Sequence, residues 1–159
     1  TNVFVPGFRT AGAYGGVFRI FLSQLANNAP FTVVGDGHQK RDFTFVTDVC
    51  DAFVKAAESD LSGEIFNVGT GNPQSVNYLA ELLKPRNVVY IPDRPGEPRE
   101  TCADSSKIQK ALGWVPKVKF EEGVGVMLSN LHEHDSSVLW TPEKIAEATK
   151  VWFEKLGGK

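Results

Sequence analysis

Two arginine-bearing segments contain the side chains best suited to hold an anion. In residues 35–46, Arg41 follows a Gly-Asp-Gly turn, and residues 94–99 read Arg-Pro-Gly-Glu-Pro-Arg. A guanidinium beside an apolar surface is costly to leave unpaired, so Arg41 should have an anionic partner. That partner is either a carboxylate of the same chain or a phosphate, and the spacing alone leaves both open. Planar guanidinium forks match phosphate oxygens, so arginines from two separate loops can grip a diphosphate from two sides.

The elements around Arg41 indicate a β-hairpin. Residues 31–34 and 43–46 are β-prone runs on either side of the Gly-Asp-Gly turn, which is the pattern of a hairpin with a longer loop. Because successive strand side chains alternate faces, Arg41 should share a face with Phe43 and Phe45. We therefore expect Arg41 at the mouth of this hairpin.

Periodicity and turn residues predict the other elements. We expect helices over residues 14–25, 47–58 with Thr47 as N-cap, 75–83, 105–112 with Gly113 as the C′ residue, 121–134 and 141–156, together with strands over 64–68 and 87–91 and a loop over 92–100. Asp48 and Asp51 fall in the first turn of their helix, where the helix dipole favours negative charge, so we interpret both as structural.

Length and composition limit the function classes. The 159 residues suffice for one domain with a core, and 42% hydrophobic with 23% charged residues is typical of a soluble globular protein. A net charge of −2, from 17 basic and 19 acidic residues, disfavours a nucleic-acid-binding face. No apolar run approaches the roughly 18 residues of a membrane span, and no signal-peptide pattern opens the chain. We expect a cytoplasmic protein.

Cysteine and histidine usage does not indicate a metal site. Cys50 and Cys102 lie far apart without a CxxC pattern, which favours reduced thiols over a zinc site or a disulfide. His132 and His134 lack further ligands nearby, so we interpret them as solvated surface. We predict that the protein binds no metal.

Six motifs follow one another in a characteristic order. They are Gly-Asp-Gly-x-Gln-x-Arg-Asp-Phe at 35–43, Val-x-Asp-Val at 46–49, Gly-Glu-Ile-Phe-Asn-Val-Gly at 63–69, Arg-Pro-Gly-Glu-Pro at 94–98, Ala-Asp-x-Ser-Lys at 103–107 and Leu-Gly-Trp-x-Pro at 112–116. From about Asn2 to about Leu131, the chain resembles the carboxyl-terminal half of the extended short-chain dehydrogenase/reductase family, whose members are nucleotide-sugar epimerases, dehydratases and decarboxylases. The resemblance implies a small mixed α/β substrate-binding lobe, with the Rossmann half absent from this chain.

This resemblance also implies a binding site for a nucleotide diphosphate sugar. Arg41 and Arg94 match the arginines that the family uses to bind the diphosphate, and Glu97 matches the acidic residue that accepts the ribose hydroxyls. Asn2 matches an asparagine that hydrogen-bonds the ligand near its phosphates. Arg99 could substitute for Arg94, although Arg94 is the better match.

The main chain at Val17, Phe18, Thr32 and Val33 resembles the parts of the family that line the base. UDP is the favoured nucleotide, with dTDP and CDP as alternatives. A nucleotide-diphosphate sugar is therefore the expected partner, without nucleic acid or membrane, and a homodimer stays open.

No catalytic residue is predicted in this chain. Hydride chemistry in the family needs a glycine-rich turn for the NAD pyrophosphate and a tyrosine followed four residues later by lysine. Gly69-x-Gly71 lacks the third glycine of such a turn. The residues four positions after Tyr14, Tyr78 and Tyr90 are Phe18, Leu82 and Arg94. We therefore expect a fragment that is inactive alone, with the catalytic, NAD-binding half upstream of Thr1.

These observations predict a lobe over 1–134 that binds a nucleotide sugar and a helical extension over 135–159. The extension should dock on the lobe or on another subunit. The favoured function is the substrate-binding part of an NAD-dependent nucleotide-sugar epimerase. The alternatives are a 4,6-dehydratase or decarboxylase of the same family, and a nucleotide-binding module without chemistry.

Overall fold

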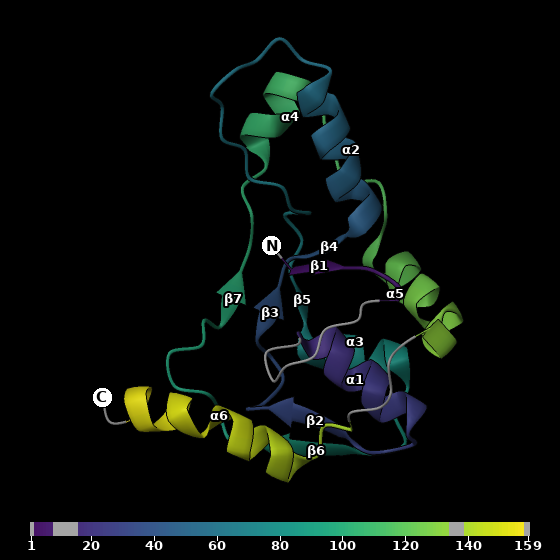
Figure 1. Ribbon diagram of the computed structural model, residues 1–159, viewed down its shortest axis with the longest axis vertical. Helices are drawn as coiled ribbons and strands as arrows, with labels where there is room; N and C mark the ends of the chain where they lie inside the picture. Colours follow the sequence, from purple (N-terminus) through teal and green to yellow (C-terminus); the bar gives the residue numbers. More distant parts are fainter. Residues whose placement is uncertain (1, 8–15, 134–138, 158–159) are drawn as a thin grey trace.

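The computed structural model describes residues 2–7, 16–133 and 139–157, which form a mixed α/β fold (Figure 1). The helices are α1 (Val17–Ala26), α2 (Val46–Ala57), α3 (Val76–Leu83), α4 (Ser106–Leu112), α5 (Phe120–Ser129), the short 3₁₀ helix η1 (Leu131–Glu133) and α6 (Pro142–Leu156). The strands are β1 (Asn2–Phe4), β2 (Phe31–Val34), β3 (Lys40–Arg41), β4 (Phe43–Phe45), β5 (Gln74–Ser75), β6 (Val88–Ile91) and β7 (Glu100–Thr101). Helices α2 and α4 lie at one end of the molecule, and β2, β6 and α6 lie at the other.

In the part of the chain that the structure describes, the strands pair in three small sheets, and the prediction of a hairpin is wrong. β2 pairs in parallel with β6, β4 pairs in parallel with β1, and β3 lies between β5 and β7. The Gly-Asp-Gly turn is followed by β3 and lies against the start of α3, where the backbone N–H of Asn77 donates to the carbonyl of Gly37 at 2.9 Å. The Asn77 side chain also donates to the carbonyl of Asp36 at 2.9 Å. Val46 begins α2 and is not part of a strand.

Phenylalanine rings form the centre of the main core. Phe4 of β1 stacks on Phe18 of α1 with ring centroids 4.6 Å apart, and Phe43 of β4 stacks on Phe120 of α5 at 5.1 Å. Such ring pairs contribute packing energy beyond the area that they bury. The rings therefore fix β1, β4, α1 and α5 relative to one another, which places the start of α1 beside β1.

A smaller cluster joins α2 to α4 around Trp114, whose side chain is fully buried. The indole Nε1 of Trp114 donates to the backbone carbonyl of Asp48 at 2.9 Å. The buried Asp48 carboxylate accepts the backbone N–H groups of Lys117 and Val118, each at 3.1 Å, while Asp51 pairs with the Lys117 ammonium at 3.0 Å. These bonds tie both aspartates to the 114–118 segment, which agrees with their structural interpretation.

Local signals placed several helix ends correctly. Ser75 caps α3 by accepting the backbone N–H of Tyr78 at 3.0 Å, and Gly113 ends α4 with a φ of 61°. Strand β6 lies within the predicted 87–91 run, and the loop over 92–100 is confirmed up to the start of β7.

Other boundaries differ from the predictions. Thr47 does not cap α2, because the helix begins one residue earlier and Phe45 occupies the N-cap position. The predicted strand over 64–68 is absent from the described residues, and Ile65 there is 83% exposed, whereas a paired strand buries one face. Helix α1 begins at Val17, and residues 14 and 15 of the prediction lie outside the described residues. Helix α5 ends at Ser129, five residues before the predicted end, and His134 lies outside the described residues.

Helix α6 packs on the same chain. Thr141 caps it by accepting the backbone N–H of Lys144 at 3.4 Å, and Ile145 and Thr149 are buried. Just before the helix, the carbonyl of Trp140 accepts a hydrogen bond from the side chain of Gln24 in α1 at 2.7 Å. These contacts lie within one chain, while the docking of the extension and the division at 134/135 stay predictions.

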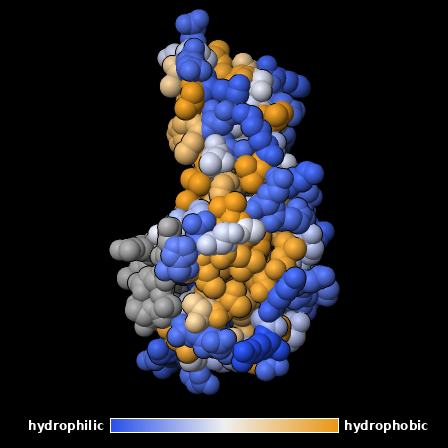
Figure 2. Space-filling view, turned by 90° about the vertical axis from the view of Figure 1, so that its right-hand side faces the viewer, coloured by the Kyte–Doolittle hydropathy of each residue, from blue (hydrophilic) through white to orange (hydrophobic). Residues whose placement is uncertain are grey.

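The surface carries charged and apolar areas side by side. Figure 2 shows apolar side chains gathered near the middle of the face that is seen from the α5 side, with polar residues around them. None of the helices in the described ranges combines the length and the apolar character needed to cross a bilayer.

Candidate functional site

Arg41 is held in place by three hydrogen bonds from its guanidinium. Nη1 donates to the carbonyls of Lys40 and Pro98 at 2.8 and 2.9 Å, and Nη2 donates to Oε1 of Glu97 at 2.7 Å. The Arg41 side chain is only 11% exposed. Both hydrogens of Nη1 are used by carbonyls, so the orientation of the guanidinium is set by the main chain and Nη2 is the group that meets an anion.

Glu97 lies between two arginines because of a tight turn. The backbone N–H of Glu97 donates to the carbonyl of Arg94 at 3.2 Å, and Gly96 has a φ of 75°. With Pro95 and Gly96 at its two central positions, this turn has the residues and the positive φ of type II. It brings Nη1 of Arg94 to 3.9 Å from Oε2 of Glu97. One carboxylate thus faces two guanidinium groups, which leaves the cluster with a net positive charge.

A pocket of about 180 Å³ opens beside this cluster. It is lined by Asn2, Gly16, Val17, Thr32, Val34, Gln39, Arg41, Val76, Arg94 and Glu97. Six of the eight residues selected from the sequence thus lie around one cavity. The other two are not among the lining residues, because the side chains of Phe18 and Val33 are buried in the main core.

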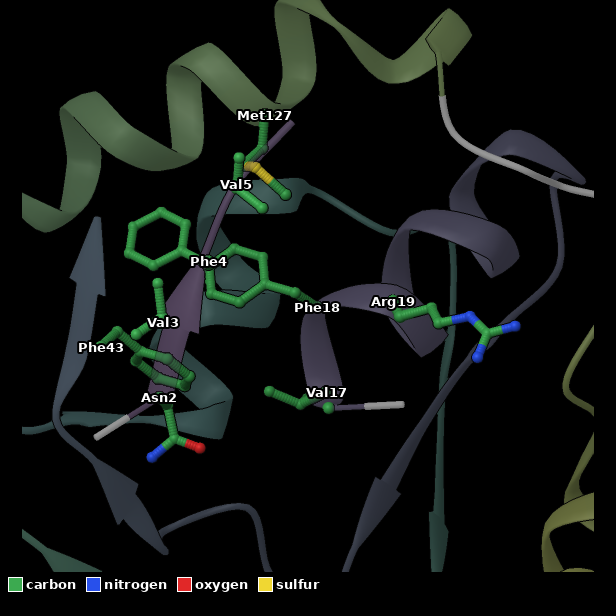
Figure 3. Close-up of a pocket in the computed structure, with 10 residues that line it drawn as sticks. Asn2, Val3, Phe4, Val5, Val17, Phe18, Arg19, Phe43 and Met127 are labelled. Atoms are coloured by element: carbon green, nitrogen blue, oxygen red, sulfur yellow. The ribbon is translucent and has the colours of Figure 1, made fainter. Parts of the chain in front are cut away.

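A second, mostly apolar pocket of about 110 Å³ adjoins the first and shares Asn2, Gly16 and Val17 with it. Figure 3 shows its lining, in which the rings of Phe4 and Phe18 lie together while the amide of Asn2 points away from them. Asn2 therefore borders both pockets and presents its polar group on the side away from these rings.

Thr32 is positioned by a buried glutamine. The fully buried Gln24 donates through Nε2 to Oγ1 of Thr32 at 2.8 Å, and its Oε1 accepts the Thr32 backbone N–H at 3.1 Å. The same Nε2 donates to the carbonyl of Trp140. Gln24 thus connects α1, β2 and the segment that precedes α6, and it fixes one wall of the pocket.

Four lining residues were not selected from the sequence, namely Gly16, Val34, Gln39 and Val76. Gln39 is 8% exposed, and its Nε2 donates to the carbonyl of Val34 at 2.8 Å. Its Oε1 has no hydrogen-bond partner among the residues that the structure describes. The alternation of strand side chains could have found it, because Gln39 lies two residues before Arg41 and hence on the same face.

Behind Arg41, Asp42 connects three segments. Its carboxylate, on a residue 1% exposed, accepts the backbone N–H groups of Thr70, Gly71 and Ala103 at 2.9 to 3.0 Å, as well as the Thr70 hydroxyl. Burial acts to raise the pKa of Asp42, but the hydrogen bonds from Thr70, Ala103 and Gly71 outweigh it and lower the pKa below 3.8. The amide groups of Thr70 and Gly71 are therefore committed to Asp42, in agreement with the prediction that Gly69-x-Gly71 is not a phosphate loop.

Arg99 is not among the residues that line the pocket. Its guanidinium forms a bidentate pair with Asp36 at 2.9 and 3.1 Å, and the Arg99 side chain is 61% exposed. The hydrogen bonds from Arg99 and from the His38 backbone lower the pKa of Asp36 to about 2. Arg99 thus serves as an internal comparison for Arg41, since it is a paired arginine on the open surface.

The metal-binding side chains do not cluster. Across residues 2–7, 16–133 and 139–157, no three His, Cys, Asp or Glu side chains are arranged to hold a metal ion. Cys50 and Cys102 are exposed and free. The chemistry that the described site offers is anion binding by Arg41 and Arg94, with Glu97 as a hydrogen-bond acceptor.

Comparison with known proteins gives consistent matches. A model of the GDP-mannose 4,6 dehydratase family matches residues 15–127. The UDP-glucose 4-epimerase of Mycolicibacterium smegmatis is 36% identical over 128 residues, which are 77% of this chain and 41% of that protein. The dTDP-glucose 4,6-dehydratase of Xanthomonas campestris is 37% identical over 122 residues, 67% of this chain and 35% of that protein. The chain therefore spans about two fifths of the length of such relatives.

Solved structures share the fold. The UDP-glucose 4-epimerase of Thermotoga maritima, crystallised with UDP-glucose, aligns with a TM-score of 0.74 at 36% identity over 83% of this chain and 44% of that one. The UDP-glucuronic acid 4-epimerase of Bacillus cereus, in complex with UDP-glucuronic acid and NAD, aligns with a TM-score of 0.74 at 28% identity over 83% and 43%. The family and the mixed α/β fold expected from the six motifs are thus confirmed. The chain belongs to the GDP-mannose 4,6 dehydratase family of nucleotide-sugar enzymes, within the extended short-chain dehydrogenases/reductases.

Proposed function

We propose that this chain binds the nucleotide diphosphate of a nucleotide sugar, as the substrate-binding part of an NAD-dependent epimerase. The observation that carries the proposal is the gathering of Arg41, Arg94, Glu97 and Asn2 around one pocket, although they come from separate parts of the chain. Two epimerases of the same fold, at 28% and 36% identity, were crystallised with UDP-sugars, which supports UDP as the nucleotide.

The ligand-free geometry suits an exchange of anions. Glu97 neutralises part of the charge of Arg41 and Arg94, but the Arg94–Glu97 separation of 3.9 Å is too long for a hydrogen bond. A diphosphate offers the guanidinium groups several charged oxygens, and charge-assisted bonds to them are among the strongest in proteins. In the complex, the two arginines bind the diphosphate, and the released Glu97 carboxylate accepts hydroxyl groups of the ribose.

The residues of this chain do not fit NAD. The amides of Thr70 and Gly71 are bound to Asp42, and no tyrosine in the sequence is followed four positions later by lysine. In our proposal, residues beyond these 159 bind NAD, which supplies the hydride chemistry. The contribution of this chain is to hold the substrate by its diphosphate and ribose.

Epimerisation is the preferred reaction because the two compared structures are epimerases. A 4,6-dehydratase is the second candidate, since the Xanthomonas dTDP-glucose 4,6-dehydratase is equally similar in sequence at 37% identity. Both reactions begin from the same kind of substrate. The nucleotide pocket is therefore common to both candidates, and base preference helps to separate them.

Calorimetric titration of the full-length protein with UDP, dTDP and CDP tests the proposal. We expect UDP to bind most tightly, and Arg41→Ala and Arg94→Ala each to weaken its binding by roughly tenfold or more, as expected for the loss of charge-assisted hydrogen bonds. Arg99→Ala is the matched control, because it removes an arginine whose partner Asp36 lies on the open surface. It should change the affinity by less than about twofold.

Two results would contradict the proposal. If none of the three nucleotides binds to the full-length protein, the pocket has another role. If Arg41→Ala lowers the thermal stability but leaves UDP binding intact, then Arg41 and Glu97 form a structural ion pair only.

A further inference from the structure

Arg94 and Glu97, which both line the pocket, are the two ends of one turn. In type I and type II turns, the peptide that joins the two central residues has opposite orientations. Here that peptide joins Pro95 to Gly96, and Gly96 has the positive φ of 75° that type II requires. Because Arg94 and Glu97 are the two ends of this turn, a shift of the turn relative to the pocket displaces both of their side chains.

Helix α6 contacts this peptide directly. The indole Nε1 of Trp152 donates to the carbonyl of Pro95 at 2.6 Å. One turn further along the helix, Leu156 lies close to Gly96, since a Cβ on that glycine would sit 3.7 Å from Cδ1 of Leu156. An indole N–H can only donate, so the turn must keep the Pro95 carbonyl directed at α6 to satisfy it. Figure 1 shows α6 passing beside the segment between β6 and β7 that contains this turn.

The contact with Trp152 is important because a cavity separates other parts of α6 from the start of the loop. A cavity of about 630 Å³ lies between the helix and the start of the loop, lined by Ile91, Pro92 and Arg94 on one side and by Ile145, Thr149 and Phe153 among others on the helix. Helix α6 is itself anchored, since Ile145 and Thr149 are buried. It therefore offers a fixed support that reaches the turn through Trp152 and Leu156.

We propose that Trp152 is a positioning residue of the nucleotide pocket, which holds the Pro95–Gly96 peptide so that Arg94 and Glu97 face the ligand. The proposal rests on the proposed function for the identity of that ligand. It assigns a role in the pocket to α6, which lies outside residues 15–127 matched by the family model. Trp152 acts through Arg94 and Glu97 and does not itself line the pocket.

The first test follows the turn without any ligand. Trp152→Phe keeps an aromatic ring but removes the donor, and Val151→Ala is the control, because Val151 lies on the same helix and is 63% exposed. In the full-length protein, amide hydrogen exchange at residues 96–97 should be about fivefold faster in Trp152→Phe and unchanged in Val151→Ala, as expected for the loss of one ordinary hydrogen bond. Unchanged exchange in Trp152→Phe would overturn the proposal.

The second test measures UDP affinity in a double-mutant cycle. Trp152→Phe should weaken UDP binding about fivefold, as expected for one lost hydrogen bond, while Val151→Ala binds like the wild type. Because Trp152 acts in part through Arg94, the Trp152→Phe/Arg94→Ala double variant should lose less UDP affinity than the sum of the two separate losses. A merely structural role would lower the thermal stability without this loss of additivity.

The outcomes separate the two proposals. Wild-type protein that does not bind UDP contradicts the proposed function, while hydrogen exchange still decides whether Trp152 holds the turn. Wild-type binding that Arg94→Ala weakens and Trp152→Phe leaves unchanged overturns the role of Trp152 and retains the proposed function. Fully additive losses in the double variant also overturn it, because Trp152 would then act independently of Arg94.

Discussion

Replacing Asp42 by asparagine tests how the segment behind Arg41 is held. The carboxylate oxygens accept two pairs of donors, the Thr70 N–H and hydroxyl at Oδ1 and the N–H groups of Gly71 and Ala103 at Oδ2. An asparagine of the same shape has one carbonyl oxygen and one NH₂ group, so it can accept from only one of these pairs. We expect Asp42→Asn to destabilise the protein strongly without changing the volume of the site.

The expected loss of stability follows from the donors that lose the charged carboxylate of Asp42 as their acceptor. If the NH₂ group of the new asparagine faces Thr70, the Thr70 hydroxyl can rotate and accept from it. The buried backbone N–H of Thr70 then loses its partner, at a cost of roughly 1–3 kcal/mol. The bonds from Gly71 and Ala103 become neutral instead of charge-assisted, which costs about 1 kcal/mol each. The free energy of unfolding should therefore fall by roughly 3–5 kcal/mol, a large part of the stability of an ordinary domain.

Urea denaturation at neutral pH, followed by circular dichroism, measures this change. Asp36→Asn is the matched control, since it makes the same substitution in the same motif at a side chain that is 51% exposed. Its effect should be small, because exposed ion pairs contribute little to stability. If Asp42→Asn costs less than about 1 kcal/mol, or no more than Asp36→Asn, then the hydrogen bonds of Asp42 make no large contribution to the stability of the fold.

The pH dependence gives a second readout of the same carboxylate. Its pKa in the folded protein is below the ordinary value of 3.8, so the folded state favours the ionised form. The stabilisation is then fully present above pH 3.8 and is lost as the pH falls through the lower pKa of the folded state. The difference in unfolding free energy between the wild type and Asp42→Asn should therefore shrink as the pH falls below 3.8. A difference that stays constant between pH 7 and the acid limit of folding would contradict the lowered pKa.

Two further substitutions test packing and capping. Gly123→Ala should destabilise the protein by about 1–3 kcal/mol, because the new Cβ would lie 2.6 Å from the Phe4 ring. Gly125→Ala on the same helix is the control, since its Cβ would meet nothing within 4 Å and the change should be neutral or stabilising by up to about 1 kcal/mol. Thermal unfolding measures both variants, and equal melting temperatures would show that Gly123 is not closely packed against Phe4. Ser75→Ala should cost about 1 kcal/mol, because it removes the cap on the Tyr78 N–H. Denaturation midpoints measure this loss, and an unchanged midpoint would show that water replaces the cap.

Features made by neighbouring residues could be read from the sequence. The helix starts near Ser75 and Thr141, and the left-handed end of α4 at Gly113, each depend on contacts within about one helical turn. The two arginine segments were also recognisable, and the residues that the family motifs point to lie largely around one pocket. Local residue types suffice in these cases because the interacting groups are close in the chain.

The choice of strand partner was not readable in this way. The sequence identified 31–34 and 43–46 as β-prone, but alternation describes which face a side chain takes and carries no information about the neighbouring strand. The structure pairs Phe31 with Val88 and Phe43 with Asn2. In the same way, Ile65 has strand-like neighbours in the sequence, and no described strand pairs with it.

The sequence by itself determined that Arg41 needs an anion, because a guanidinium beside an apolar surface cannot stay unpaired at low cost. Only the tertiary structure decided which anion it meets in the ligand-free chain, namely Glu97 at 2.7 Å and 56 positions away. It also decided that Gln39 joins the pocket and that Trp152 donates a hydrogen bond to the turn between Arg94 and Glu97. These contacts join segments far apart in the chain, and their energies depend on distances that residue order does not specify.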